Sequence, residues 1–284
     1  MNWTAEQSRR LAELGAGAEE LALEFADGRA ANAAFQKLEK RLNRIAAEGI
    51  RRHLAEAGRP EGTELREGLS RALRGAGFTE VRTPLTVTRN LLERMGLDGD
   101  HALQSQIFWL DRNRAVRPML APNLYYLMVD LLRVAPRPVS IFEIGTCMRR
   151  ESHGERHGEE FTMLNVVEMG LPLESRQGRV LELARLVIDA AGLPFAECRL
   201  EAEESAVYAE TLDVVSPGGL ELASTAMGPH PLDAPWKIDV PWVGLGFGIE
   251  RLAMARRIAR GETANLARVS GSLSYLAGFR LNIP

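Results

Sequence analysis

Three glycines alternate with apolar residues just before an arginine in residues 244–251, which read GLGFGIER. Alternating glycines clear one face of a strand, so a flat ligand can lie directly against the backbone. Arg251 would fall in the first turn of the helix that follows, where the amide dipoles favour an anion. The stretch is not the dinucleotide fingerprint G-x-G-x-x-G, because Ile249 occupies the place of the last glycine. Three glycines alone favour the simpler interpretation, a tightly packed strand with an Arg–Glu surface pair.

A second group of charged residues surrounds a candidate hairpin at residues 142–161. One strand ends at Arg149 and Glu151, a polar loop containing glycine and His157 follows, and the returning strand begins with Glu-Glu-Phe at residues 159–161. The two-residue period of a strand places Arg149 and Glu151 on the same face, and the hairpin brings the charges of both arms together. An Arg-x-Glu pair by itself usually indicates a cross-strand salt bridge, so this stretch is also weak evidence alone.

The pattern of apolar residues predicts the elements that must hold these side chains. Because several strands follow one another without an intervening helix, we expect an α+β fold whose sheet is largely antiparallel and flanked by helices. A doubly wound parallel fold is disfavoured. Helices are expected near residues 122–134, 176–192 and 247–260. Strands are expected at residues 78–83, 106–110, 138–148, 160–169, 196–202, 211–215, 219–227 and 241–246.

The first sixty residues predict a helical hairpin. Apolar residues recur at three- and four-residue steps on both sides of a break at Asp27 and Gly28. Residues 37–59 hold seven basic and three acidic residues, a local charge of +4 that could face a polyanion. We therefore divide the chain into an N-terminal hairpin over residues 1–58 and a main domain over residues 59–284.

The junction between these two parts has the composition of a linker. Residues 58–62 contain two glycines and a proline, and Thr63 is then predicted to cap a helix that runs to about Arg74.

Composition limits the possible classes of function. The 284 residues are 45% hydrophobic and 26% charged, which is typical of a globular chain with a full core, and no run is long enough to cross a membrane. Of the 35 basic residues only three are lysines, and none precedes Ser or Thr, so a P-loop is excluded. Two cysteines without C-x-x-C spacing favour a reducing cytoplasm. The net charge of −3 is too small to indicate a polyanion partner.

In combination, the two charged stretches are much more specific than either is alone. They resemble motifs 2 and 3 of the class II aminoacyl-tRNA synthetases, and residues 75–84 resemble motif 1. The resemblance covers about residues 60–275. Because only a helical hairpin precedes this region, the chain resembles the form of the enzyme that lacks a separate N-terminal tRNA-binding domain. Within the class, similarity to the catalytic domain of the pyrrolysyl family is carried by residues 120–125, 141–145, 159–165, 208, 211–214 and 241–242.

This resemblance implies a ligase that uses ATP to activate pyrrolysine, or a related N-acyl-lysine, as an adenylate and then transfers the acyl group to the 3′ end of a tRNA. Arg149 is implied to hold the α-phosphate and the amino acid carboxylate, and Arg251 the γ-phosphate of a bent ATP. Glu151 is implied to read the adenine amino group, and Phe161 to stack on the ring. His157 lies in the loop where the family contacts the triphosphate.

The family also implies a magnesium site and an amino-acid pocket. Glu221 and Ser224 match its magnesium-binding pair, with Glu221 joining Arg149 and Arg251 as the catalytic set; oxygen ligands suit this ion. Asn165 would read the amide carbonyl of an acylated lysine, and the hydroxyl of Tyr208 would close over the ligand. The pocket lining carried over is Ala121, Leu124, Tyr125, Met128, Asn165, Val167, Tyr208, Trp242 and Gly244.

Three residues depart from the family pattern. Met128 stands where leucine is common and Val167 where cysteine is common, which would reshape the pocket floor. Gly158 stands where leucine is usual, which would alter the motif 2 loop. These departures bear on which substrate side chain the pocket prefers rather than on adenylation.

Partners follow from the same resemblance. Motif 1 forms the subunit interface of the class, which implies a homodimer, and no membrane contact is expected. The candidate tRNA surfaces are the +4 segment and the basic stretch from Arg251 onward, with Arg256, Arg257, Arg260, Arg268 and Arg280.

Two alternatives stay open. A class II synthetase for phenylalanine would suit the apolar lining, whereas one for phosphoserine would need basic residues that the lining lacks. A non-catalytic paralogue acting as a regulator would be expected to lose Arg149, Glu221 or Arg251, and all three are present.

Overall fold

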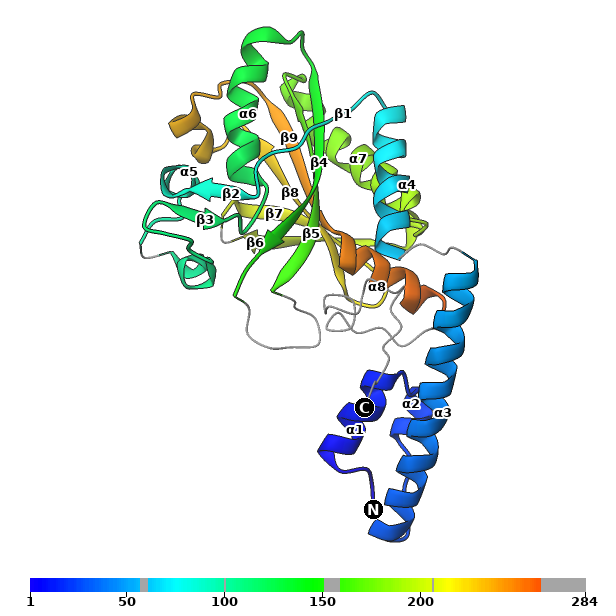
Figure 1. Ribbon diagram of the computed structural model, residues 1–284. Helices are drawn as coiled ribbons and strands as arrows, with labels where there is room; N and C mark the ends of the chain where they lie inside the picture. The colour runs from blue at the N-terminus through cyan, green and yellow to red at the C-terminus, as the bar shows by residue number, and fades with distance from the viewer. Residues whose placement is uncertain (57–60, 100, 151–158, 206, 262–284) are drawn as a thin grey trace.

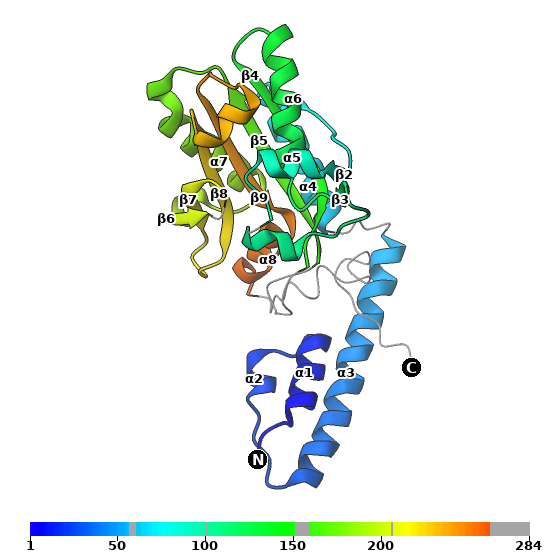
Figure 2. The same ribbon diagram turned by 90° about the vertical axis from the view of Figure 1, so that its left-hand side faces the viewer.

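The computed structural model describes all residues except 57–60, 100, 151–158, 206 and 262–284. The chain folds into a group of N-terminal helices and a larger body built on a sheet (Figure 1). In both Figure 1 and Figure 2 the N-terminal helices lie beyond one end of the sheet body.

The N-terminal helices are α1 (Ala5–Leu14), α2 (Ala18–Leu21) and α3 (Gly28–Ala55). As predicted, the long helix begins at the Asp27–Gly28 break, because the Asp27 side chain accepts a hydrogen bond from the N–H of Ala30 at 2.8 Å. The first arm differs from a single helix, since Gly15 adopts a left-handed φ of 96° that ends α1. A small apolar core of its own holds the hairpin together: Trp3, Leu11, Leu14, Ala16, Leu38 and Leu42.

The main sheet has seven strands in the order β1-β4-β5-β9-β8-β7-β6. Only the pairing of β1 with β4 is parallel, and the other pairs are antiparallel, as the α+β prediction requires. The strands are β1 (Thr79–Glu80), β4 (Val139–Met148), β5 (Glu160–Met169), β6 (Arg199–Ser205), β7 (Ala209–Val215), β8 (Glu221–Gly228) and β9 (Trp242–Gly248). A separate two-stranded sheet joins β2 (Thr86–Thr88) to β3 (Arg114–Val116).

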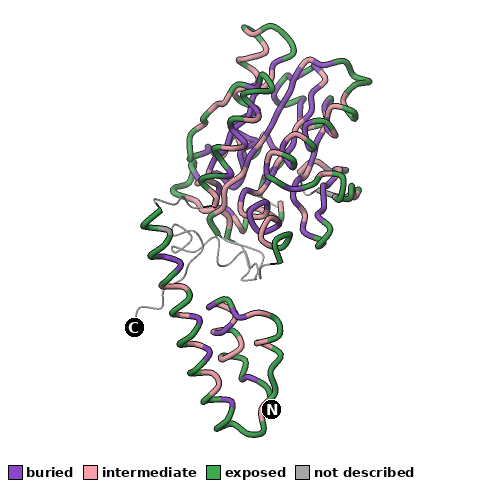
Figure 3. Tube along the Cα trace, turned by 90° about the vertical axis from the view of Figure 1, so that its right-hand side faces the viewer, coloured by how far each residue is buried: buried purple, intermediate pink, exposed green. Residues whose placement is uncertain are grey.

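The two faces of the sheet have different covers. Helices α4 (Glu61–Gly75), α7 (Arg176–Ala190) and α8 (Ile249–Ala259) pack on one face with side chains such as Phe142, Val166 and Phe247. Helices α5 (Arg89–Arg94) and α6 (Ala121–Val134) belong to a second apolar cluster with Ile141, Val167 and Trp242. Because side chains alternate along a strand, neighbouring residues enter different clusters. Figure 3 shows buried residues running along the central strands.

A buried ion pair ties the end of the motif 1 stretch to the sheet. The Arg117 guanidinium lies 2.8 Å from the Glu143 carboxylate and also donates to the carbonyl and hydroxyl oxygens of Thr83. The second carboxylate oxygen of Glu143 accepts from the Thr83 hydroxyl at 2.7 Å. A Cβ at Gly145 would stand 2.1 Å from Arg117 Nη2, so only glycine leaves room for this arginine. The ion pair is therefore fully surrounded by partners, as a buried pair must be.

The structure corrects three predicted elements. No strand forms at residues 106–110, where only Trp109 makes a single bridge to Ala115. The apolar residues there are satisfied by packing: Ile107 is buried and the Arg89 guanidinium lies 3.9 Å from the centre of the Trp109 ring. The strand predicted at 78–83 shortens to Thr79–Glu80. The other predicted strands, and the three helices expected beyond residue 120, match within three residues at either end.

The third correction concerns the start of α4. The helix begins at Glu61, so Thr63 lies inside it rather than capping it. Glu61 accepts from the side chains of Arg257 at 2.8 Å and Arg260 at 3.2 Å, and these partners lower the pKa of its carboxyl against the effect of burial. A contact from α8, distant in sequence, thus accompanies the earlier start of α4.

Candidate active site

The glycines of β9 form the floor of a cavity on the α6 face of the sheet. Gly244, Gly246 and Gly248 pair with Val167, Asn165 and Met163 of β5. On the other side Gly246 and Gly244 pair with Ser224 and Ala226 of β8. Because paired residues share a face of the sheet, the side chains of β5 and β8 form two banks beside a strip without side chains. The open strand face predicted from the alternating glycines is present.

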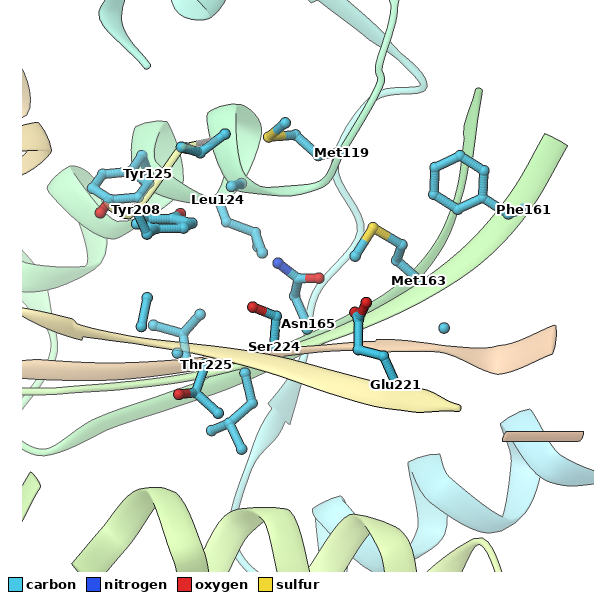
Figure 4. Close-up of a pocket in the computed structure, with 18 of the residues that line it drawn as sticks. Met119, Leu124, Tyr125, Phe161, Met163, Asn165, Tyr208, Glu221, Ser224 and Thr225 are labelled. Atoms are coloured by element: carbon cyan, nitrogen blue, oxygen red, sulfur yellow. The ribbon is translucent and has the colours of Figure 1, made fainter. Parts of the chain in front are cut away.

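The cavity above this floor has a volume of about 390 Å³. Of the predicted site residues, Glu151, His157 and the departing Gly158 lie outside the described residues. All the others line this one cavity: Ala121, Leu124, Tyr125, Met128, Arg149, Phe161, Asn165, Val167, Tyr208, Glu221, Ser224, Trp242, Gly244 and Arg251. In Figure 4, Tyr125 and Tyr208 lie at one end, Phe161 and Glu221 at the other, and Asn165 and Ser224 between them.

The charged end of the cavity is formed by two arginines from different elements. Arg149 follows β4, donates through Nε to the carbonyl of Pro118 at 2.8 Å, and holds its guanidinium carbon 5.3 Å from the centre of the Phe161 ring. Arg251 lies in the first turn of α8, and its Nη1 is 2.8 Å from Oε1 of Glu221. Arg251 is thus paired with a glutamate of β8, which lies outside the glycine stretch. Two cations, an aromatic face and the carboxylates of Glu221 and Glu250 line this end.

Glu250 is a member of the cavity wall that the sequence analysis missed. Both of its carboxylate oxygens lie 2.9 Å from the backbone nitrogen of Thr162, which joins the start of α8 to the strand beside Phe161. Burial raises the pKa of the Glu250 carboxyl, and the hydrogen bonds from Thr162 oppose that rise. Glu250 therefore fixes the spacing between Arg251 and Phe161.

Oxygen ligands gather in the middle of the cavity around Ser224. Its hydroxyl donates a hydrogen bond to the carboxylate of Asp213. Burial raises the pKa of that carboxyl, and the bond from Ser224 partly counteracts the rise. Glu221 lies on the same strand, three residues away, with its side chain 44% exposed. Among the described residues no group of three or more His, Cys, Asp or Glu side chains forms a metal cage. This donor set suits a hard cation that takes most of its ligands from water and a phosphate chain.

The opposite end of the cavity is aromatic and deeply buried. Tyr125 of α6 and Trp242 of β9 are 3% and 2% exposed and meet edge to face with ring centres 5.8 Å apart. The Tyr208 ring centre lies 6.3 Å from that of Trp242. Burial raises the pKa of both tyrosine hydroxyls well above the usual range, so both stay protonated. This end is a neutral apolar pocket with two hydroxyl groups.

Asn165 occupies the middle of the floor with an unused hydrogen-bonding atom. Its Oδ1 is buried and has no hydrogen-bond partner among the described residues. An unpaired buried polar atom costs free energy of about 1–3 kcal/mol. Because the side chain lines the cavity, a ligand with a complementary amide group would satisfy it.

A few of the residues that the sequence analysis missed, such as Met163 on β5 and Ala226 on β8, lie at positions which the two-residue period would have found. Met163 lies between Phe161 and Asn165 on the same face of β5. Leu103 comes from a short 3-10 helix (Ala102–Gln106), and Met119 and Val207 from irregular segments, so none of them carries such a signal. The further lining residues not predicted are Glu160, Thr225, Ala226, Leu245 and Glu250, whereas Gly246 and Gly248 belong to the predicted glycine face.

Comparisons with known proteins agree with this geometry. The family model of the tRNA synthetase class II core domain (F) matches residues 49–259. The crystal structure of pyrrolysyl-tRNA synthetase from Desulfitobacterium hafniense superposes with a TM-score of 0.89 at 47% identity, over 100% of this chain and 99% of that one. This chain belongs to the pyrrolysyl family of class II tRNA synthetases. The predicted family and fold are therefore confirmed.

More distant relatives match only part of the chain in sequence. Histidine–tRNA ligase of Leptospira biflexa is 28% identical over 143 residues, which are 48% of this chain and 32% of the relative. The phenylalanine–tRNA ligase alpha subunit of Methanospirillum hungatei is 29% identical over 155 residues, 51% of this chain and 31% of that subunit. The chain thus spans about a third of the length of these curated relatives. No helix among the described residues has the length and apolarity to cross a membrane.

Proposed function

We propose that this chain activates pyrrolysine, or a closely related N-acyl-lysine, with ATP and transfers it to the 3′ end of a tRNA. The observation that carries the proposal is one cavity with a charged end, an aromatic end and an unsatisfied Asn165 amide between them. The charged end suits the triphosphate and the reacting carboxylate, and the other two features suit the side chain of an acylated lysine. The 47% identity to pyrrolysyl-tRNA synthetase of Desulfitobacterium hafniense over the whole chain supports the choice of amino acid.

The chemistry requires alignment and charge stabilisation rather than a protein nucleophile. The amino acid carboxylate itself attacks the α-phosphate, so the protein must hold the two groups in line and neutralise developing charge. Arg149 would bridge the carboxylate and the α-phosphate, and Arg251 would hold the γ-phosphate. Phe161 would stack on adenine beside the Arg149 guanidinium. The planar guanidinium matches phosphate bidentately, which a lysine ammonium does not.

Magnesium would be held by Glu221 at the charged end of the cavity together with Ser224 beside it. The donors there are oxygens, and the two residues supply only part of a coordination shell, as this ion prefers when phosphates supply the rest. When bound, the ion neutralises charge on the triphosphate. Asp213 accepts the hydroxyl hydrogen of Ser224, which leaves the lone pairs of Ser224 available to a cation.

The aromatic end would select the amino acid side chain. Among the described lining residues the cations are Arg149 and Arg251, both at the charged end. None of the described residues that line the other end is acidic, and the Asp233 carboxylate behind them is already bonded to Tyr125, Trp242 and the His230 N–H. An acylated, neutral lysine therefore fits better than a free ammonium. The carboxamide of Asn165 can turn by 180°, so either its oxygen or its NH₂ group can face the substrate amide.

One alternative substrate is supported by a specific observation. The phenylalanine–tRNA ligase relative and the apolar, aromatic pocket favour phenylalanine as a second candidate substrate. Phenylalanine would leave the buried Oδ1 of Asn165 unsatisfied, which disfavours it. Phosphoserine would need a basic side chain at the aromatic end, and a regulator would have no use for the intact charged end.

For the tRNA we propose the exposed basic face of α3. Lys37, Lys40, Arg51 and Arg52 are exposed on that helix. Arg41 is paired with Glu20, and the α8 arginines Arg256, Arg257 and Arg260 all lie near Glu61. Arg268 and Arg280 lie outside the described residues. The hairpin cations are therefore the better candidates for phosphate contacts.

A homodimer formed through the motif 1 segment, and a cytoplasmic location, complete the proposal. Both rest on membership of the class II synthetases.

ATP–pyrophosphate exchange with a panel of amino acids tests the function. We expect exchange with pyrrolysine or N-acyl-lysines and none with lysine. Exchange with phenylalanine or phosphoserine instead would overturn the proposed substrate, and no exchange with any amino acid would favour the regulator.

A further inference from the structure

A buried carboxylate outside the cavity holds two of its aromatic walls. Asp233 lies in the short helix η4 (Pro231–Trp236) and is 2% exposed. Its Oδ1 accepts from the Tyr125 hydroxyl at 3.0 Å, and its Oδ2 accepts from Trp242 Nε1 at 2.9 Å and from the His230 backbone N–H at 2.6 Å. One side chain thus joins α6, β9 and the start of η4. Asp233 is not itself part of the cavity lining.

His230 extends this connection to the third aromatic wall. Its Nδ1 lies 3.2 Å from the backbone N–H of Leu232, so Nδ1 accepts and carries no proton. Its Nε2 lies 3.1 Å from the carbonyl oxygen of Tyr208, which can only accept. The His230 ring therefore donates from Nε2 to Tyr208. The two rings also meet edge to face with centres 5.7 Å apart.

We propose that Asp233 and His230 are positioning residues for the amino-acid end of the cavity. Asp233 fixes the two rigid walls, and His230 latches the turn that carries Tyr208 against Trp242. The three aromatic side chains come from α6, β9 and the β6–β7 turn, and the contacts with η4 link all of them to one small element. The latch itself does not depend on the proposed function. Its expected consequence, a higher affinity for the acyl-lysine side chain, does rest on that function.

A pair of substitutions separates the latch from the local structure of η4. In His230→Asn the amide oxygen can replace Nδ1 and cap Leu232, but the side chain is too short to reach the Tyr208 carbonyl. In His230→Gln the longer amide can reach that carbonyl, but the cap on Leu232 is lost. A latch predicts that Gln restores function and Asn does not, whereas a purely structural role predicts the reverse.

The first readout is pyrophosphate exchange by the full chain with an N-acyl-lysine. For His230→Asn we expect the KM of the amino acid to rise about 3–10-fold, as loss of one hydrogen bond allows, with kcat and the KM for ATP unchanged. For His230→Gln we expect a KM within about twofold of the unchanged protein. Equal KM values for the two variants, or a rise in the Gln variant alone, would overturn the latch.

The second readout does not depend on the substrate. Hydrogen exchange of the turn between β6 and β7 should quicken in His230→Asn and stay unchanged in His230→Gln, with the melting temperature recorded to confirm that both fold. Equal rates of hydrogen exchange in the two variants would overturn the latch even if the enzyme is active. If the unchanged protein activates no N-acyl-lysine, the proposed function fails. The difference in hydrogen exchange between the two variants still tests the latch in that case.

Discussion

The two ends of the cavity are built on opposite physical plans. At the charged end, the side chains of Arg251 and Glu221 are 30% and 44% exposed and contact each other at 2.8 Å. At the aromatic end, Tyr125 and Trp242 are almost wholly buried and share one buried carboxylate, Asp233. The first end consists of charges close to water, and the second of packed rings with their polar atoms satisfied inside the protein.

This difference follows from what each end must bind. Fully burying the arginines would impose a desolvation penalty of several kcal/mol per ion, so they stay near water until a polyanion arrives. An apolar side chain offers little orientation of its own, so the rings must be held in advance, which reduces the entropy lost on binding. Specificity should therefore depend on the rigid aromatic end, and rate on the charged end.

The largest expected effect comes from removing the charge at one end. Arg251→Ala should lower kcat/KM of pyrophosphate exchange by about 10²–10³-fold, because a preorganised partner of the phosphates is lost. Arg251→Lys should also fail, since the bidentate geometry is absent. Exchange rates equal to those of the unchanged protein would remove Arg251 from the site.

The next effect should appear at the boundary between the ends. In Asn165→Ala, kcat/KM for an N-acyl-lysine should fall by about 5–150-fold through loss of the amide contact, while the KM for ATP stays the same. The matched control is a lysine analogue in which an ester or alkyl group replaces the amide, which should lose less. If amide substrates are activated equally well by the mutant, the assignment of Asn165 is wrong.

Two glycines of the floor provide a direct comparison of the ends. A Cβ at Gly244 would stand 3.0 Å from Trp242, and one at Gly248 would stand 3.4 Å from the Arg251 stem. Gly244→Ala should raise the KM of the amino acid by about 5–10-fold, as overpacking displaces the indole. Gly248→Ala should instead raise the KM of ATP, and by a smaller factor, because the flexible Arg251 stem can move aside. The two KM values measured in both variants check this, and a reversed pattern would mean that the ends are exchanged.

The smallest effect is expected from the departures in the pocket lining. Met128→Leu nearly conserves volume, so it should change the free energy of unfolding by less than about 1.5 kcal/mol. It should shift the ratio of kcat/KM between a short and a long acyl-lysine by less than about tenfold, because the swap nearly conserves volume and so changes less than a full methylene contact, which contributes about 1–3 kcal/mol. A larger shift would show that Met128 controls substrate size directly.

The charged end was the more predictable of the two from the sequence. Arg149, Phe161 and Arg251 belong to compact motifs whose strand and helix positions follow from local periodicity, so the elements that hold them were expected in place. The walls lined by Tyr125, Tyr208 and Trp242 were found through the family resemblance and lie in the cavity. Their roles toward ligands stay predictions.

The support of the aromatic end was not predictable in the same way. Asp233 and His230 lie in a Gly/Pro-rich stretch that reads as a loop, and their partners are up to 108 residues away in the chain. The earlier start of α4 and the absence of a strand at residues 106–110 have a similar cause. Contacts with Arg257 and Arg89 are tertiary, and no local pattern reports them.

A crystal structure of the protein with a non-hydrolysable ATP analogue and an N-acyl-lysine would test the central claim most directly. We expect the adenine on Phe161, the γ-phosphate at Arg251, the substrate amide at Asn165, and the acyl group between Tyr125 and Trp242. A nucleotide bound outside this cavity, or an acyl-lysine side chain lying at the charged end, would contradict the division of the cavity into these two ends.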